Sequence, residues 1–172
     1  MLVRLLMLTG FALALFAYQA SAAEVDVYGT FNYKLSHDEN TSGVAYSKLE
    51  DNTSIMGIDV SSPLAVGMSG FAKLEVGVDT DDSGSDTLDS RLAYVGLKTS
   101  NGASISMGRQ SHPFTNNIGG KTSIFNVYGS SADFNYGSRS SNSLGFSLGE
   151  GSAVSIDGLA ILNGSAGQSD SF

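Results

Sequence analysis

The chain has 172 residues, no cysteine, and 17 acidic side chains against nine basic ones, which gives a formal net charge of −8. Lys and Arg form no cluster, so the composition excludes a nucleic-acid partner and offers no basic patch for an anionic membrane surface. The lack of Cys excludes a disulfide framework and cysteine-based metal sites.

Residues 1–22 have the three parts of a secretory signal peptide. Arg4 supplies the positive charge, an apolar run follows from residue 5 to residue 17, and Ala20 and Ala22 flank Ser21 in an A-x-A cleavage arrangement. The run is shorter than the roughly 20 apolar residues that a membrane-spanning anchor helix, the alternative, would need. We predict export and cleavage after Ala22, which leaves residues 23–172 as the mature chain.

Beyond residue 22 the apolar side chains alternate with polar ones, as in half-buried β-strands. In residues 68–79, Leu74 and Val76 share one face while Lys73 and Glu75 share the other. No later stretch is apolar for long enough to form a transmembrane helix, although hydrophobic residues make up 41% of the chain. This diluted pattern is typical of strands that span an outer membrane. Seven strands are expected, at residues 25–35, 46–61, 68–79, 91–98, 103–109, 136–148 and 153–162.

The connections between these segments alternate in length. Short turns on one rim and long loops on the other are typical of membrane barrels, whereas a soluble β-sandwich, the alternative fold, does not need this sorting. The connection after residue 111 has no helical period and is too long for an ordinary loop, so we expect it to fold into the bore and narrow it. The long connections are residues 37–45, 80–89 and 111–133, and the short ones are 62–66, 99–102 and 150–152.

Four segments, in order, carry a family resemblance: AEVDVYG at residues 23–29, SRLAYVGLK at 90–98, SMGRQ at 106–110 and GSRSSNS at 137–143. Together they resemble the general diffusion porins of Gram-negative outer membranes. The resemblance implies an all-β, 16-stranded antiparallel transmembrane barrel and a homotrimer set in outer-membrane lipid, including lipopolysaccharide. It further implies passive diffusion of small hydrophilic solutes and ions, selected by size and charge at an inward-folded third loop.

Seven strands cannot close around a wide aqueous channel, because barrel diameter grows with strand number. Single-chain bacterial barrels also have an even number of strands, from eight upward. We therefore expect residues 23–172 to form the N-terminal portion of a longer barrel.

The resemblance also indicates where the pore would be narrowest. Arg91 and Arg139 match two basic residues of the family's pore wall. Both alternate out of phase with neighbouring apolar residues, namely Leu92 and Tyr94 for Arg91 and Leu144 and Phe146 for Arg139, which predicts that both arginines face the lumen. Ile55 and Thr30 stand where family members often carry further basic residues.

The constriction loop departs from the family's acidic pattern. Ser123 and Val127 occupy the acidic positions, Lys121 is the loop's own charge, and no acidic residue appears before Asp133. Phe125 and Asn126 lie between them. Steric restriction is therefore better supported by the sequence than a strong transverse field. A simpler alternative for the arginines is that each neutralises a nearby lumenal acid such as Asp59, Glu75 or Asp157.

Other motifs point to no further chemistry. Residues 79–86 resemble the front of a calcium loop, but Ser90 stands where the bidentate Glu is required, so a solvated loop is favoured. His37 and His112 lie in different predicted loops without ligand spacing, so we expect no metal site and no cofactor. No catalytic arrangement is recognisable, and we expect no enzyme. The alternative function is a non-conducting outer-membrane barrel with a structural or adhesive role through its long loops.

Overall fold

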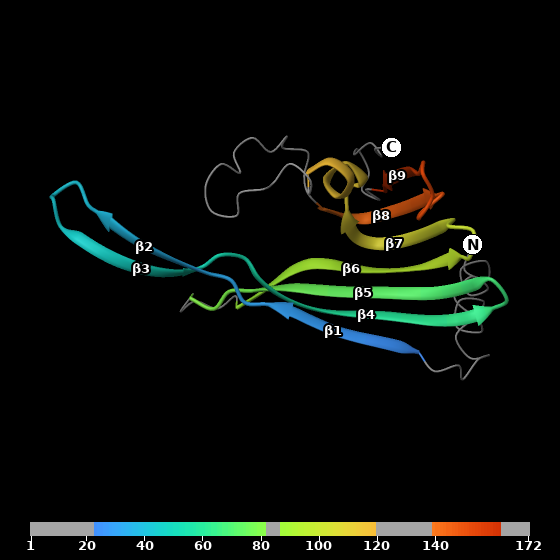
Figure 1. Ribbon diagram of the computed structural model, residues 1–172, viewed down its shortest axis with the longest axis horizontal. Coiled ribbons are helices and arrows are strands. Elements are labelled where there is room, and N and C mark those ends of the chain that lie inside the picture. Colours follow the sequence, from blue (N-terminus) through green and yellow to red (C-terminus); the bar gives the residue numbers. More distant parts are fainter. Residues whose placement is uncertain (1–22, 82–86, 120–138, 163–172) are drawn as a thin grey trace, which may run out of the picture.

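The computed structural model describes residues 23–81, 87–119 and 139–162, and these ranges form nine antiparallel β-strands in two sheets. The larger sheet has seven strands in the order β1-β4-β5-β6-β7-β8-β9, and the smaller one pairs β2 with β3 (Figure 1). A π-helical turn, η1, covers Thr115–Gly119. The strands are β1 Glu24–Thr30, β2 Tyr33–Glu39, β3 Ala45–Asp51, β4 Ser54–Ala65, β5 Met68–Val78, β6 Leu88–Thr99, β7 Ser104–Ser111, β8 Arg139–Leu148 and β9 Ile156–Ile161.

The seven predicted strands correspond to the seven strands of the larger sheet, but the long loop predicted at residues 37–45 is wrong. There β2 and β3 continue the chain as a hairpin that projects beyond the larger sheet (Figure 1). Its turn is short because the Asn40 side chain accepts hydrogen bonds from the amides of Ser42 and Val44, and Gly43 adopts a φ of 78°. An Asx turn of this kind reverses the chain within a few residues, so the residues on both sides of it can pair as β2 and β3.

Two interruptions separate this hairpin from the larger sheet, at residues 31–32 and 52–53. Thr53 has a φ of 68°, which is uncommon for a residue that is not Gly. The breaks are held together, since the amide of Asn32 donates to Ser54 Oγ at 3.0 Å and the amide of Asn52 donates to the Asn32 carbonyl at 2.7 Å. The predicted strands 25–35 and 46–61 are therefore each divided in two.

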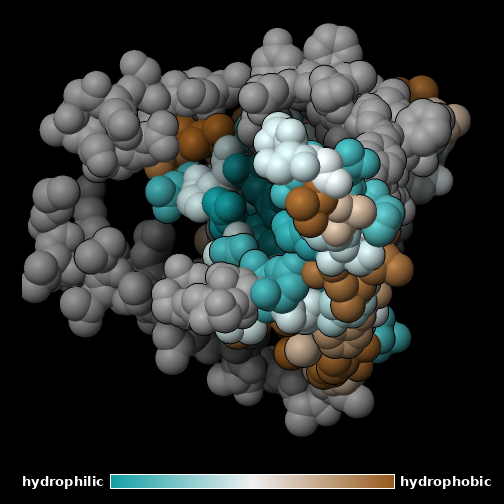
Figure 2. Space-filling model, turned by 90° about the vertical axis from the view of Figure 1, so that its left-hand side faces the viewer, coloured by the Kyte–Doolittle hydropathy of each residue, from teal (hydrophilic) through white to brown (hydrophobic). Residues whose placement is uncertain are grey.

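The two faces of the larger sheet differ in polarity. Hydrophobic side chains such as Val27, Leu74 and Met107 are exposed on one face, and the described part of the chain has no buried hydrophobic residue. A soluble sandwich would bury such a face, so this arrangement contradicts that alternative and fits a sheet whose apolar side meets lipid. The other face forms a hollow lined with hydrophilic residues, while hydrophobic residues gather on the outer surface (Figure 2).

Aromatic side chains on the polar face lie opposite glycines. Tyr28 pairs with Gly57, and a Cβ on Gly57 would lie 2.3 Å from Tyr28 Cζ. Phe71 pairs with Gly96 in the same way, with a corresponding distance of 2.3 Å to Phe71 Cζ. Each glycine leaves room for a ring to lie across it, which is how aromatic residues compensate for glycine in a strand.

In the described ranges, no helix is long and apolar enough to cross a membrane.

Candidate functional site

The candidate site begins with a register shift between β5 and β6. Glu75 pairs with Leu92 and Val76 pairs with Ser90, so Arg91 is the extra residue of a β-bulge. Arg109 stabilises the bulge, because its Nε donates to the Arg91 carbonyl at 3.1 Å. Bulges redirect side chains, and this one brings the Arg91 side chain to Glu75.

Arg91 and Glu75 form an ion pair on the polar face. Arg91 Nε donates to Glu75 Oε1 at 2.7 Å, and the side chains are 23% and 10% exposed. The sequence placed Arg91 on the correct face for the wrong reason. Leu92 and Tyr94 pair with Glu75 and Lys73 and therefore share the polar face with Arg91, whereas alternation predicted the opposite face. The bulge explains the error, because an inserted residue breaks the two-residue period.

A second ion pair joins Lys73 and Asp59 on the same face, two residues along β5 from Glu75. Lys73 Nζ contacts both carboxylate oxygens of Asp59, at 2.9 and 2.8 Å, and lies 4.6 Å from the centre of the Tyr28 ring. The Tyr28 hydroxyl donates to Glu75 Oε2 at 2.8 Å, which connects the two ion pairs. Four strands thus contribute to one network, with Tyr28 on β1, Asp59 on β4, Lys73 and Glu75 on β5, and Arg91 on β6.

Arg139 stands at the start of β8, before a register shift in which Asn142 has a φ of 53°. None of the ion pairs formed among the described residues includes Arg139. It lines a cleft of about 300 Å³ together with Arg91. The structure therefore brings the two predicted wall arginines to one cleft. Arg91 pairs with a lumenal acid, as the simpler alternative expected, whereas Arg139 forms no such pair within the described ranges.

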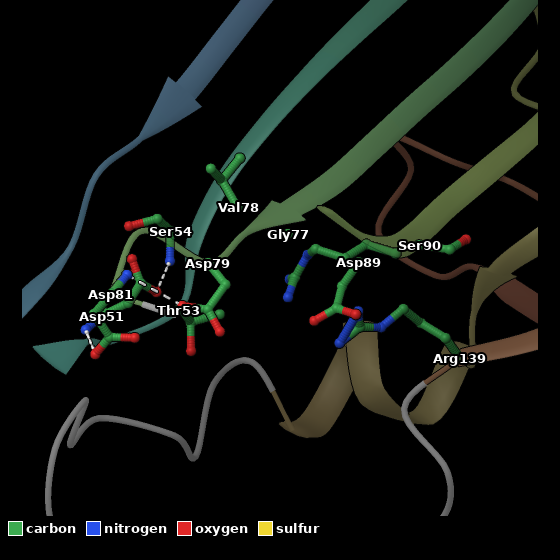
Figure 3. A pocket seen from close by; sticks show the side chains of 11 residues that line it. Asp51, Thr53, Ser54, Gly77, Val78, Asp79, Asp81, Asp89, Ser90 and Arg139 are labelled. Atoms are coloured by element: carbon green, nitrogen blue, oxygen red, sulfur yellow. Dashed lines mark hydrogen bonds between the residues drawn. The ribbon is translucent and has the colours of Figure 1, made fainter. Parts of the chain in front are cut away.

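The same cleft is also lined by the aspartates Asp51, Asp79, Asp81 and Asp89 (Figure 3). Asp51, Asp79 and Asp81 lie together toward one end of the cleft, away from Arg139. Asp51 accepts hydrogen bonds from the Ser54 amide and Thr80 Oγ1, both at 2.9 Å, and the bonds to Ser54 hold its pKa below the usual range. Within the described ranges, no group of His, Cys, Asp or Glu has the arrangement of a metal site.

The beginning of the long connection after β7 lies against the polar face. Asn117 Nδ2 donates to Asp157 Oδ2 of β9 at 3.0 Å, and His112 Nε2 lies 2.7 Å from Ser140 Oγ. Pro113, Asn116 and Asn117 line a second cavity of about 930 Å³ that is also bordered by Lys73 and Tyr94. The loop residues Lys121, Ser123, Phe125, Asn126 and Val127, with the rest of 120–138, lie outside the described residues, as does the predicted signal peptide.

Comparison with known proteins identifies the family. The sequence profile described as Gram-negative porin matches residues 9–169. The chain belongs to the Gram-negative porin family. Porins are non-enzymatic channels, which agrees with the prediction that the chain is not an enzyme.

Among solved structures, this porin is similar to the anion-selective porin from Comamonas acidovorans, with a TM-score of 0.59 and 19% sequence identity. The match covers 74% of this chain and 43% of that porin, so the chain spans less than half of its length. At this identity the similarity concerns the fold, and it supports the predicted antiparallel porin sheet. A comparison with curated proteins finds no match.

From the sequence, Glu75 is expected only as one possible neutralising acid, and Tyr28 and Gly57 have no expected role. The strand register would have indicated that Tyr28 lies near Glu75, because Tyr28, Gly57 and Glu75 are paired side by side on β1, β4 and β5. A glycine between a tyrosine and a carboxylate lets the ring reach across to the acid. Pairing partners are long-range information, which alternation within one strand does not provide.

Proposed function

We propose that this chain forms part of the wall of an outer-membrane channel through which small hydrophilic solutes and ions diffuse passively. The observation that carries the proposal is the combination of an exposed apolar face with a charged, hollowed polar face on a single porin-type sheet. The apolar face suits lipid and lipopolysaccharide, and the polar face suits water. A 16-stranded barrel assembled as a homotrimer is the form we propose for the complete channel.

Selection by size and charge belongs to the same proposal. Arg91 and Arg139 would lie on the constriction wall, and the loop after β7, including Lys121, Ser123 and Phe125, would fold inward to narrow the bore. Support comes from η1, whose Asn117 contacts Asp157 across the lumenal side. Low-dielectric walls focus the field of a few charges, so these arginines can bias which ions enter.

The test uses the complete gene product refolded into lipid. Liposomes that contain it should swell in neutral sugars at rates that fall with sugar size, and planar bilayers should show stepwise conductance. A well-folded protein without conductance or swelling would contradict the channel and support the alternative, a barrel that acts through its long loops.

Charge selection is tested by Arg91→Ser combined with Arg139→Ser. This double variant should shift the reversal potential in a salt gradient toward cation preference. The matched control is Lys34→Ser with Lys48→Ser, which removes the same charge from the projecting β2–β3 hairpin. An unchanged reversal potential in the arginine variant, or an equal shift in the control, would refute the role of the two arginines.

A further inference from the structure

Resting on the proposed function, we infer that Glu75 is a specificity-determining residue that masks Arg91, so that a passing anion engages Arg139. Tyr28, Gly57 and Glu75 lie side by side on neighbouring strands, and the bulge places Arg91 next to Glu75. The two arginines that match basic residues of the family's pore wall would then have different roles in the pore.

Both oxygens of the Glu75 carboxylate are occupied. Oε1 accepts from Arg91 Nε at 2.7 Å and Oε2 accepts from the Tyr28 hydroxyl at 2.8 Å. The residue is 8% exposed, so little of it remains for a solute to contact. Hydrogen bonds to ionised groups are the strong ones, and a guanidinium held by a carboxylate has fewer donors for a passing anion.

Tyr28 is the positioning residue. Its ring reaches Glu75 only because Gly57 has no side chain, since a Cβ there would lie 2.5 Å from the Tyr28 hydroxyl oxygen. Lys73, which is itself paired with Asp59, lies 4.6 Å from the ring centre and contacts its face. The ring is thus fixed from two sides, and Glu75 is held toward Arg91.

Arg139 contrasts with Arg91 in this respect. It shares the cleft of about 300 Å³, but none of the ion pairs found in the described ranges includes it. Asp89 lines the same cleft, but no carboxylate of the described ranges pairs with the Arg139 guanidinium, so its donors can bind an anion that enters the cleft. Arg91 and Glu75 together contribute no net charge at the same level.

The experiment measures block of single-channel conductance by sulfate at constant ionic strength, in the complete gene product. Arg139→Gln should raise the half-blocking sulfate concentration by about threefold, the size expected for one exposed charge a few ångströms from the ion. Glu75→Gln should lower it by about threefold, because Arg91 becomes available to the ion. The neutral pair Glu75→Gln with Arg91→Gln should return it to within about 1.5-fold of the wild-type value.

Asp157→Asn is the matched charge control. Asp157 also lies on the polar face, but it accepts hydrogen bonds from Asn117 and Ser155 instead of holding an arginine. Removing its charge should change the half-blocking concentration by less than about 1.5-fold. Equal effects of Glu75→Gln and Asp157→Asn would show that only total lumenal charge matters and would overturn the inference.

Two substitutions that keep every charge test the positioning role. Tyr28→Phe removes the hydroxyl, and Gly57→Ala displaces the ring, so each should lower the half-blocking concentration by about 1.5- to twofold, less than the full unmasking by Glu75→Gln. Gly96→Ala displaces Phe71, which does not contact Glu75, and should have no such effect. Block that is unchanged in both Tyr28→Phe and Gly57→Ala would refute the role of Tyr28.

The outcomes separate this inference from the proposed function. A gene product that does not conduct would refute the channel itself. A conducting channel in which the Glu75→Gln, Arg91→Gln double variant is blocked as weakly as Arg139→Gln would leave the channel intact and overturn the masking of Arg91.

Discussion

Replacing Gly96 with Ala should destabilise the protein, although the change adds only one methyl group. The new Cβ would lie 2.3 Å from Phe71 Cζ and 2.5 Å from the carbonyl oxygen of Ile105. The ring can rotate away, but Ile105 pairs with Leu97 in the β6–β7 ladder, so its carbonyl can move only with the backbone. Overpacking of this kind costs about 1–3 kcal/mol.

A second effect of the substitution partly offsets this loss of stability. Gly→Ala reduces the conformational entropy of the unfolded chain and stabilises by about 0.4–1 kcal/mol where the backbone is compatible. The expected net loss is therefore about 1–2 kcal/mol in the free energy of unfolding. Gly70→Ala is the control, because its Cβ would meet the flexible Leu64 side chain, with the nearest atom at 3.3 Å. Its effect should stay within about 0.5 kcal/mol.

The assay is urea unfolding of the complete gene product in lipid vesicles, followed by the electrophoretic mobility of the folded form. Gly96→Ala should lower the midpoint without changing the slope, and Gly70→Ala should leave the midpoint in place. A Gly96→Ala protein as stable as Gly70→Ala would show that the Phe71 ring and the ladder adjust freely, and would refute the role given to the glycine–aromatic pairs.

Two further predictions concern the ends of the sheet. Because hydrogen bonds from Ser54 lower the pKa of Asp51, the stabilisation it gives the β2–β3 hairpin is present above about pH 5 and is lost as pH falls below about 4. Hydrogen exchange of the hairpin should accelerate over that range, and Asp51→Asn should weaken this pH dependence. The remainder comes from Glu50, whose pKa is lowered by hydrogen bonds from Lys48 and Lys34. At the opposite rim, Gly102→Ala should destabilise far more than Lys98→Ala, because Gly102 has a φ of 80° and its Cβ would lie 2.6 Å from the Glu150 carbonyl oxygen. The Lys98–Glu150 ion pair is exposed, with side chains 41% and 52% accessible, so Lys98→Ala should cost less than about 1 kcal/mol in the same urea titration.

The alternation of apolar and polar residues was sufficient to predict the strands of the larger sheet. In a strand with one apolar face and one face in water, the polarity of the side chains must repeat every two residues. Alternation placed Lys73 and Glu75 on the polar side, where the structure has them. It failed for Leu92 and Tyr94, since the bulge at Arg91 shifts the period by one residue and nothing in the local sequence marks that insertion.

The candidate site was predictable only in part. The resemblance indicated Arg91 and Arg139, and the structure brings both to one cleft. The partner of Arg91 depends on the strand register. The register also decides that Tyr28 lies opposite Gly57, where the missing side chain leaves room for the ring. The extension of β2 to Glu39 was missed because polar residues such as Ser36 and Asp38 gave this stretch the composition of a loop.

Each strand of the larger sheet has its neighbour nearby in the chain, so the sheet can grow one hairpin at a time. During that growth the newest strand has an unpaired edge next to a face of exposed hydrophobic side chains. An open edge beside apolar surface is the combination that promotes aggregation in water. The apolar face that suits a lipid-embedded wall therefore makes the unfinished sheet prone to aggregation for as long as it is in water.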